Sequence, residues 1–471
     1  MSNEPARQPN VLFILADDMG YGDMAHYGNP IIDTPNLDQL ARDGVTLTQH
    51  YSASPLCAPA RAALLTGRYN HRTGAVDVPS NRGLDRFAIE ETTVADVFVN
   101  AGYPTALIGK WHNGMHDMRY HPNNRGFQHF YGLFGAMDYF NWTLDRNGTP
   151  DRADGRYLTE VLSDEAVGFV DAHANDPFFL YLAYNAPHKP LQAPEEIIKR
   201  YRASGDLTEE VATLYAMIES MDAGIGRVLG ALTKNGLDEN TIIVFTSDNG
   251  PVLRGNLDRY NGPFRGQKGQ AWEGGIRVPG VVRWPGHLPS GEQSDEMVHF
   301  CDWLPTLASM ANIALPDDLE LDGYDVTCRL EGKSGDIPDV RFWQRNRYEP
   351  VPRCNAAMRD GDWKLHWPMR DGADIKDPAD QAFYEHTVKG AAHWLMDIDP
   401  DLPQREMGPE PEVNLFNLAE DPGEGNDLSD EHPERVERMQ HRWDEWFEEM
   451  KTEWRGAREK IENNAQLPSP Q

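Results

Sequence analysis

Short, continuous apolar runs alternate with longer amphipathic segments through the first two thirds of the chain. Apolar runs of this length, bounded by turn residues, predict strands that are buried on both faces. Such strands are expected at residues 10–16, 104–109, 178–184 and 241–247. Helical spacing between capping residues predicts helices at 34–44, 91–102 and 211–236. The alternation is typical of an α/β fold with a large, mainly parallel sheet flanked by helices.

The last third has a different pattern, which begins after a hydrophilic stretch at 331–339 that we interpret as a linker. Residues 356–367 predict a β-hairpin with Asp360 and Gly361 at its turn. Residues 433–460 predict a helix whose apolar stripe packs onto the small sheet and is not a cofactor site. We therefore expect two domains, an α/β domain at 1–335 and a smaller α+β domain with an antiparallel sheet and a packing helix at 336–471.

The composition is that of a folded globular protein, with 39% hydrophobic and 10% aromatic residues. A formal net charge of −31 argues against nucleic acid and against an anionic membrane surface as partners. No segment approaches the ~20 apolar residues that span a membrane. The polar start of the chain lacks the pattern of a secretory signal. We expect a cytoplasmic protein from the sequence as written, and a periplasmic or secreted one if the native start was trimmed.

Oxygen-bearing side chains follow two of the predicted strands at their C-terminal ends. Asp17 and Asp18 follow the first strand, and Asp248 and Asn249 follow the last. Ligands of open α/β sheets bind outside the carboxyl ends of the strands, so these residues are expected to meet. Three carboxylates and an amide suit calcium or magnesium and not zinc. Taken singly, each of them fits a helix cap or a turn.

A second set of residues at the strand ends is cationic. Lys110 and His112 follow the strand at 104–109, and His188 follows the strand at 178–184. Lys268 lies in a glycine-rich loop. A single histidine is more often structural and a single loop lysine is more often solvated. The recurrence of acids and bases at equivalent strand ends favours one shared site for an anion.

Cys57 is one of four cysteines, which form neither a disulfide scaffold nor a CxxC zinc motif. It is expected at the N-terminus of a short helix, because Pro59 suits the first turn and Gly67 can end the helix. Such an N-terminus favours anions, and Arg61 lies one turn further on. Cys57 fits a buried structural cysteine, a thiolate nucleophile or the precursor of another group. A thiolate beside a hard cation is a poor chemical match.

These residues stand in motifs that resemble the type I sulfatases of the alkaline-phosphatase-like superfamily. CAPAR at 57–61 fits the Cys-x-Pro-x-Arg signature of that family and is followed by LLTGRY. The other blocks, in the family's order, are ILADDMGYGD, GKWHNG, RGFQHFYGLFGAMDYF, NAPHKP, TSDNG, GQKGQAWEGGIRVP and LFNLAEDPGEGNDLS. One block would be weak evidence, but this ordered set spans nearly the whole chain and is highly specific.

The resemblance implies an alkaline-phosphatase-like fold and an enzyme that hydrolyses sulfate esters. It implies that a maturation enzyme oxidises Cys57 to formylglycine, whose hydrated form Arg61 would hold. The metal ligands would be Asp17, Asp18, Cys57, Asp248 and Asn249, with Ca²⁺ expected in preference to Mg²⁺. The catalytic set would be Cys57, Arg61, Lys110, His112, His188 and Lys268, of which the last four would grip the sulfate oxygens.

The mechanism that the resemblance implies is a double displacement. One hydroxyl of the diol attacks sulfur, helped by the metal and by Asp248, and His188 or Lys268 protonates the departing alcohol. His112 then takes the proton of the second hydroxyl as sulfate is expelled. Two alternatives stay open: a phosphonate monoester or phosphodiester hydrolase on the same signature, and a non-catalytic sulfated-glycan binder if Cys57 stays a thiol.

The substrate is expected to be a sulfated carbohydrate, because such substrates prevail in the family. Arginines near the site could read carboxylates or further sulfates of an anionic sugar, and Arg345 is our candidate for substrate binding. The residues near the motifs or on expected rim loops are His116, Asp117, Arg125, Asp138, Tyr139, Trp142, Arg254, Arg265, Arg345 and Arg347. For most of them a solvated charge is the simpler interpretation.

Overall fold

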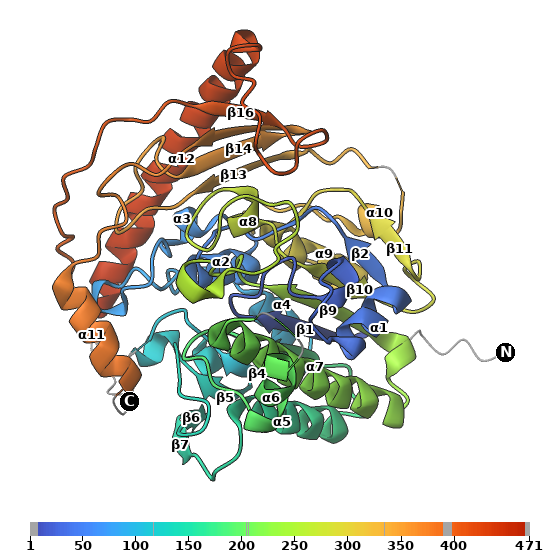
Figure 1. Ribbon diagram of the computed structural model, residues 1–471. Helices are drawn as coiled ribbons and strands as arrows, with labels where there is room; N and C mark the ends of the chain where they lie inside the picture. The colour runs from blue at the N-terminus through green and yellow to red at the C-terminus, as the bar shows by residue number, and fades with distance from the viewer. Residues whose placement is uncertain are drawn as a thin grey trace.

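A ten-stranded mixed sheet forms the centre of the molecule, as a computed structural model shows (Figure 1). The structure describes residues 8–115, 117–203, 205, 207–333, 335–389 and 398–466. In spatial order the strands are β11 (Glu292–Ser294), β2 (Val45–Leu47), β10 (Gly280–Arg283), β9 (Thr241–Ser247), β1 (Asn10–Ala16), β8 (Phe179–Ala183), β4 (Thr105–Lys110), β5 (His129–Leu133), β6 (Thr143–Arg146) and β7 (Thr149–Arg152). The five strands from β9 to β5 are parallel, and β10, β6 and β7 run antiparallel to their neighbours.

The four strands expected from the sequence are β1, β4, β8 and β9, which are adjacent in this sheet. All of their residues are buried, which explains their continuous apolar runs. The edge strands β6 and β7 are short and partly exposed, so they lack such a run. The mainly parallel α/β architecture is confirmed, and the antiparallel edges are the part that the pattern missed.

Helices cover both faces of the sheet. Alternate residues of β1 point to opposite cores: Phe13 lies in one hydrophobic cluster, and Leu12 and Ile14 lie in the other. The Leu12 face is covered by α1 (Pro35–Asp43), α5 (Leu158–Ala172), α6 (Glu195–Ala203) and α7 (Glu209–Lys234). The Phe13 face is covered by α2 (Cys57–Thr66), α4 (Val94–Asn100) and α9 (Trp303–Met310). The three helices expected from the sequence are thereby confirmed as α1, α4 and α7.

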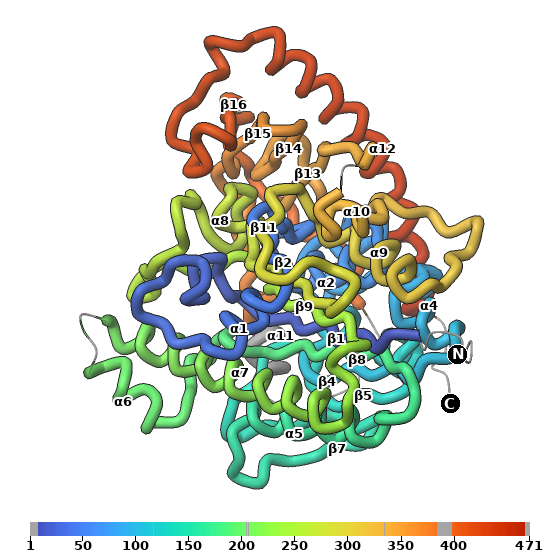
Figure 2. The backbone as a smooth tube through the Cα atoms, turned by 90° about the vertical axis from the view of Figure 1, so that its right-hand side faces the viewer, coloured from blue at the N-terminus to red at the C-terminus, as the bar shows by residue number. Residues whose placement is uncertain are grey.

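A second, antiparallel sheet lies above α2, on the side away from α5 and α7 (Figure 2). Its strands are β13 (Val340–Gln344), β14 (Ala356–Asp360), β15 (Trp363–Trp367) and β16 (Asn414–Asn417). The expected hairpin is β14–β15, but Asp360 pairs with Trp363, so its loop residues are Gly361 and Asp362, one position later than expected. The expected helix is α12 (Pro433–Ala465), whose Trp443, Trp446 and Met450 are buried in the core, as predicted.

The two sheets share one hydrophobic core. Tyr69, just after α2, packs edge-on against Trp446 of α12, and its hydroxyl accepts a hydrogen bond from the Phe342 N–H of β13. The division at residue 335 therefore stays a prediction. Besides short 3-10 helices, the remaining helices and strands of the described residues are α3 (Asn70–Thr73), α8 (Glu273–Ile276), α10 (Thr327–Leu330), α11 (Pro378–Lys389), β3 (His50–Tyr51) and β12 (Val298–His299). In the part of the chain that the structure describes, no helix is long and apolar enough to cross a membrane.

Candidate active site

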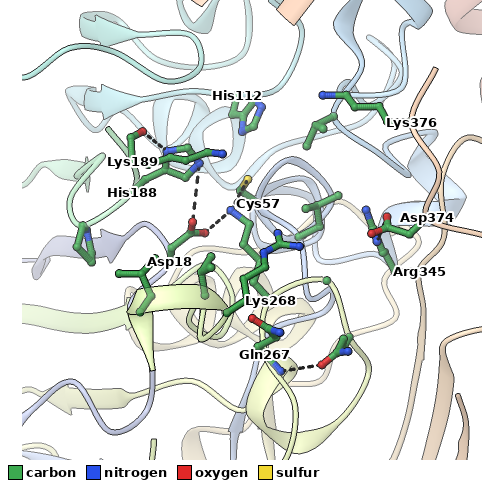
Figure 3. Close-up of a pocket in the computed structure, with 18 of the residues that line it drawn as sticks. Asp18, Cys57, His112, His188, Lys189, Gln267, Lys268, Arg345, Asp374 and Lys376 are labelled. Atoms are coloured by element: carbon green, nitrogen blue, oxygen red, sulfur yellow. Dashed lines mark hydrogen bonds and ion pairs between the residues drawn. The ribbon is translucent and has the colours of Figure 1, made fainter. Parts of the chain in front are cut away.

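The expected site residues gather where the carboxyl ends of the parallel strands meet the first turn of α2 (Figure 3). One cavity of about 580 Å³ is lined by Asp18, Cys57, His112, His188 and Lys268, among others. Next to these lie the buried residues Asp17, Arg61, Lys110, Asp248 and Asn249. The structure therefore brings together all residues of the expected metal-binding and catalytic sets.

Hydrogen bonds hold three strand ends together beneath the cavity. The Asp17 N–H donates to the carbonyl of Ala186, in the loop after β8, at 3.0 Å. The Asp18 N–H donates to Oδ1 of Asp248, which follows β9, at 3.1 Å. Asp18 (φ 68°) and His112 (φ 63°) adopt left-handed backbone conformations. Such a conformation costs a non-glycine residue on the order of 1–3 kcal/mol and is typical of functional sites.

Two buried oxygens of the expected metal-binding set have no hydrogen-bond partner among the described residues. Asn249 Nδ2 donates to Oδ1 of Asp18 at 2.8 Å, and its own Oδ1 is left unpartnered, as is Oδ1 of Asp17. Ligand atoms of Asp17, Cys57 and Asp248 lie within 4.8 Å of one another. Unpartnered, buried carboxylate and amide oxygens are the donors that a hard divalent cation prefers. The residues present therefore fit calcium or magnesium.

Two fully buried cations pair with these carboxylates. Lys110 Nζ donates to Oδ2 of Asp17 at 2.6 Å, and Arg61 Nε donates to Oδ2 of Asp248 at 2.9 Å. Arg61 Nη1 also donates to the Lys110 carbonyl at 2.8 Å. Burial and Asp17 raise the pKa of Asp248 to about 6, although Arg61 and Lys110 oppose this. Arg61 thus ties α2 to the ends of β4 and β9, and its expected contact with an oxygen at position 57 stays a prediction.

His188 and Lys268 face the same point from different loops. His188 Nδ1 donates to the carbonyl of Lys189 at 2.7 Å, which leaves Nε2 directed at Asp18, 3.8 Å from Oδ2. Lys268 Nζ forms an ion pair with Asp18 and lies 3.8 Å from Sγ of Cys57. Burial lowers the pKa of His188 to about 3. Burial also opposes the charge of Lys268, but Asp18, Cys57, Asp17 and Asp248 together outweigh it and raise the pKa of that amine.

Cys57 is the first residue of α2, whose N-terminal turn has no side-chain cap. Its thiol is buried, and burial raises its pKa above the ordinary value, although Lys110 and Lys268 act in the opposite direction. A raised pKa disfavours the thiolate nucleophile that the sequence left open. The position suits an uncharged precursor at an anion-favouring helix end.

Three of the suggested rim residues, Arg254, Arg345 and Arg347, line the cavity. The sequence missed Asp374 and Lys376, which also line it and which lie between β15 and α11. The sequence pattern did not mark these two residues as site residues, because they belong to a polar stretch far from every motif. Only the packing of the C-terminal region brings that stretch over the site.

The other suggested rim residues have structural roles. The Arg125 guanidinium donates to the carbonyls of Ile89 and Glu91, and Arg265 stacks on Trp272. Asp117 forms an ion pair with Arg119, and the Asp138 carboxylate accepts hydrogen bonds from the N–H groups of Phe140 and Asn141. The Tyr139 hydroxyl donates to the carbonyls of Asn185 and His188. The Trp142 indole N–H donates to the Arg156 carbonyl. The interpretation as solvated charges is wrong for Asp117 and Arg125, which are buried and hold hydrogen bonds or ion pairs inside the fold. His116 lies outside the described residues.

Comparisons with known proteins agree with the motifs. The family model described as Sulfatase matches residues 9–313. The chain is 35% identical to human (Homo sapiens) arylsulfatase A, over 90% of this chain and 84% of that protein. It is 32% identical to N-acetylgalactosamine-6-sulfatase of Canis lupus familiaris, over 89% of this chain and 82% of that protein. The crystal structure of Ps i-CgsB in complex with k-i-k-neocarrahexaose matches with a TM-score of 0.78 and 30% identity, covering 93% of each chain.

Proposed function

Because the chain belongs to the sulfatase family, we propose that it removes sulfate from a sulfated carbohydrate in the cavity beside Cys57. The observation that carries the proposal is the convergence on Cys57 of four cationic or imidazole side chains and an oxygen-rich set in which two buried oxygens lack a hydrogen-bond partner. A sulfate ester needs this combination, with positive groups for its oxygens and a nucleophile at a fixed position.

A bound cation and a modified side chain complete this proposal. Asp17, Asp18, Asp248 and Asn249 would hold a divalent cation, with calcium ahead of magnesium, together with a formylglycine made from Cys57 by a maturation enzyme. Formylglycine supplies an oxygen nucleophile in its hydrated form, and the cation supplies a Lewis acid that lowers the pKa of bound oxygen. Replacement of sulfur by oxygen also removes the mismatch between a thiol and a hard cation.

The side chains of the chain bind and orient the ester. Lys110, His112, His188 and Lys268 contact the sulfate oxygens, and the ion pairs to Asp17 and Asp18 fix the two lysines. Lys268 holds its proton strongly, which suits a group that stabilises negative charge throughout the reaction. His188 has Nδ1–H bound to a backbone carbonyl, so Nε2 is the atom that can exchange a proton with the leaving alcohol.

The carbohydrate substrate rests on the relatives. One of them is named for a sulfated amino sugar, and one solved structure holds an oligosaccharide. A phosphonate monoester hydrolase, SpPMH from Silicibacter pomeroyi, matches with a TM-score of 0.63 at 20% identity, which reflects the fold alone. The sulfatase proposal is therefore tested directly against the phosphonate alternative.

The experiment is expression with and without a formylglycine-generating enzyme. Peptide mass analysis at Cys57 is expected to show conversion of the thiol to an aldehyde only with that enzyme. Hydrolysis of an aryl sulfate is expected to follow the converted fraction, to vanish in Cys57→Ala, and to be lost with a chelator and restored by calcium. Full conversion without sulfate ester hydrolysis, or faster turnover of an aryl phosphonate, would reject the proposal. Sulfated-sugar binding with an unmodified thiol in the native host would favour the binder instead.

A further inference from the structure

The cavity is rich in positive charge although the chain carries a net charge of −31. Its lining holds the cations Lys189, Arg254, Arg259, Lys268, Arg345, Arg347 and Lys376, and the carboxylates Asp18 and Asp374. Lys268 pairs with Asp18, and Arg259 pairs with Asp23. Those two cations are therefore neutralised by carboxylates next to the Cys57 side of the cavity.

Most of the remaining positive charge lies across the cavity from Asp18 and His188. Figure 3 shows Arg345, Asp374 and Lys376 together on the opposite side of Cys57. Arg345 follows β13, and its side chain is 2% exposed. The C-terminal region therefore supplies this wall of the cavity.

The guanidinium groups of this wall are held in fixed positions. Asp374 Oδ1 lies 2.6 Å from Nη1 of Arg345 and 3.2 Å from Nε of Arg347. Arg347 Nη1 is held from behind by Asp77, at 2.8 Å. Arg345 Nε is buried and has no hydrogen-bond partner among the described residues. Guanidinium donors that are already fixed bind sulfate and carboxylate groups well because little side-chain freedom remains to be lost.

The charge of the wall exceeds what its two carboxylates neutralise. Arg254 lines the same cavity as Asp374. Burial raises the pKa of Asp374, but Arg345, Arg347 and Arg254 together hold it below its ordinary value. Within the described residues, no carboxylate lies at ion-pair distance from the exposed Arg254. Lys376 Nζ donates to Oε1 of Gln381, and Asp77 and Asp380 also act on its charge. The three guanidinium groups of Arg254, Arg345 and Arg347 thus stand against Asp374 and Asp77.

We propose that Arg254, Arg345, Arg347 and Lys376 form a second anion-binding subsite, which takes a further sulfate or carboxylate of the same substrate molecule. This rests on the proposed function, since the first subsite is the one beside Cys57. The substrate is then a sulfated sugar with at least two anionic groups. Purely solvated charges would not need Asp374 and Asp77 to fix two guanidinium groups inside a cavity.

The test compares three disaccharides that share the cleaved residue: one with a single sulfate, one with a second sulfate, and one with a uronic carboxylate. With the formylglycine-bearing enzyme, kcat/KM for a two-anion sugar is expected to exceed that for the single sulfate by about tenfold or more. The two-anion sugar that shows the larger gain identifies the second group. Equal kcat/KM for all three sugars would overturn the proposal.

The variants are Arg254→Gln and the double variant with Lys376→Gln. Each variant is expected to reduce the ratio of kcat/KM between a two-anion sugar and the singly sulfated sugar. In the double variant, kcat/KM for the two-anion sugar is expected to fall to about that for the singly sulfated sugar. The control is Arg438→Gln on α12, which removes the same charge from an exposed residue outside the cavity. If Arg438→Gln lowers the preference as much as Arg254→Gln does, net charge is the cause and the subsite is rejected.

Binding separates this proposal from the proposed function. Calorimetric titration of the same sugars into wild-type, Arg254→Gln and Arg438→Gln protein needs no turnover. If no sulfate ester is hydrolysed but the two-anion sugars bind about tenfold more tightly, dependent on Arg254, the proposed function fails and the subsite stands. If sulfate is hydrolysed without any such preference in binding or turnover, the subsite fails and the proposed function stands.

Discussion

At the residue scale, the position of His188 depends on a buried tyrosine. The Tyr139 hydroxyl lies 2.7 Å from the carbonyl of Asn185 and 2.8 Å from that of His188, at both ends of the loop that presents the imidazole. The sequence marked Tyr139 as a rim candidate because it stands in a family block. The structure shows a positioning residue, which the pattern could not separate from a substrate contact because both lie near the same motif.

Tyr139→Phe is expected to lower kcat on an aryl sulfate by about tenfold, because a loosened loop misplaces Nε2 of His188. The loss of hydrogen bonding should also cost about 1–2 kcal/mol of stability. The control is Tyr157→Phe, because the Tyr157 ring stacks on Tyr139. This variant removes a hydroxyl that donates to the Gln192 carbonyl at 2.8 Å. Similar stability loss in both variants with a kcat loss only in Tyr139→Phe supports the positioning role. Equal kcat losses would refute it.

A buried histidine away from the site links stability to pH. His50 Nε2 accepts a hydrogen bond from Trp303 Nε1 at 2.9 Å, and Nδ1 contacts the Pro279 carbonyl at 3.3 Å. Burial lowers the pKa of His50 to about 3. The folded state therefore binds fewer protons than the unfolded state between that value and the ordinary pKa near 6.5. Folding stability is present above pH 6.5 and is lost as the pH falls through this window.

His50→Gln should remove about 1.4 kcal/mol per pH unit of this dependence between roughly pH 6 and pH 4. Its absolute stability will fall as well, so the slope of unfolding free energy against pH is the diagnostic quantity. His441→Gln, at a histidine whose side chain is 74% exposed, should leave the slope as in the wild type. Urea unfolding at several pH values measures the slope for the wild type and both variants. An unchanged slope in His50→Gln would contradict the assignment of this pH dependence to His50.

At the scale of elements, the long central strands were predictable and their partners were less so. Strand β1 is buried on both faces, so its sequence is apolar throughout and the pattern is unambiguous. β2 and β11 are three residues each, too short to show a period. The acidic residues, Lys110, His112 and His188 were predictable for the same reason, because they stand at the ends of strands that the pattern identified. Cys57, Arg61 and Lys268 follow no such strand and were found from the motifs. Asp374 and Lys376 follow no such strand of the main sheet.

A buried ion triad joins α8 to the small sheet. Lys364 of β15 lies 2.9 Å from Glu273 of α8 and 2.7 Å from Glu424, and all three side chains are fully buried. Lys364→Met leaves two buried carboxylates without their shared cation. It is expected to destabilise the fold by about 3–5 kcal/mol.

Lys333→Met is the matched control for the triad, since Lys333 is 68% exposed and pairs with Glu331 at the surface. It should change stability by less than about 1 kcal/mol. Chemical unfolding monitored by circular dichroism gives both values. Equal, small effects would show that the triad contributes little to holding α8 against β15.

At the scale of the whole molecule, the two regions that the sequence separated contribute to one hydrophobic cluster. Phe342 of β13 stacks on Trp446 at 4.7 Å, and both belong to the cluster that contains Leu64 of α2. Arg458 of α12 is buried as well, and its guanidinium donates a hydrogen bond to the carbonyl of Arg82 in the first region. The change in pattern near residue 335 is real, but it marks a change in sheet type within a continuous core. A sequence pattern reports burial and not the partner, so this continuity could not be predicted.

We therefore expect the full chain to unfold as one unit and residues 1–335 alone not to fold. A fragment that ends there exposes Tyr69 and the α2 face, which the C-terminal sheet and α12 cover. Calorimetry of the full chain should give one main transition, with tryptophan fluorescence and circular dichroism changing together. A soluble fragment with its own cooperative transition would show instead that the boundary separates independent domains. Since the wall with Arg345 and Asp374 comes from beyond residue 335, such a fragment would also carry only the Cys57 half of the cavity.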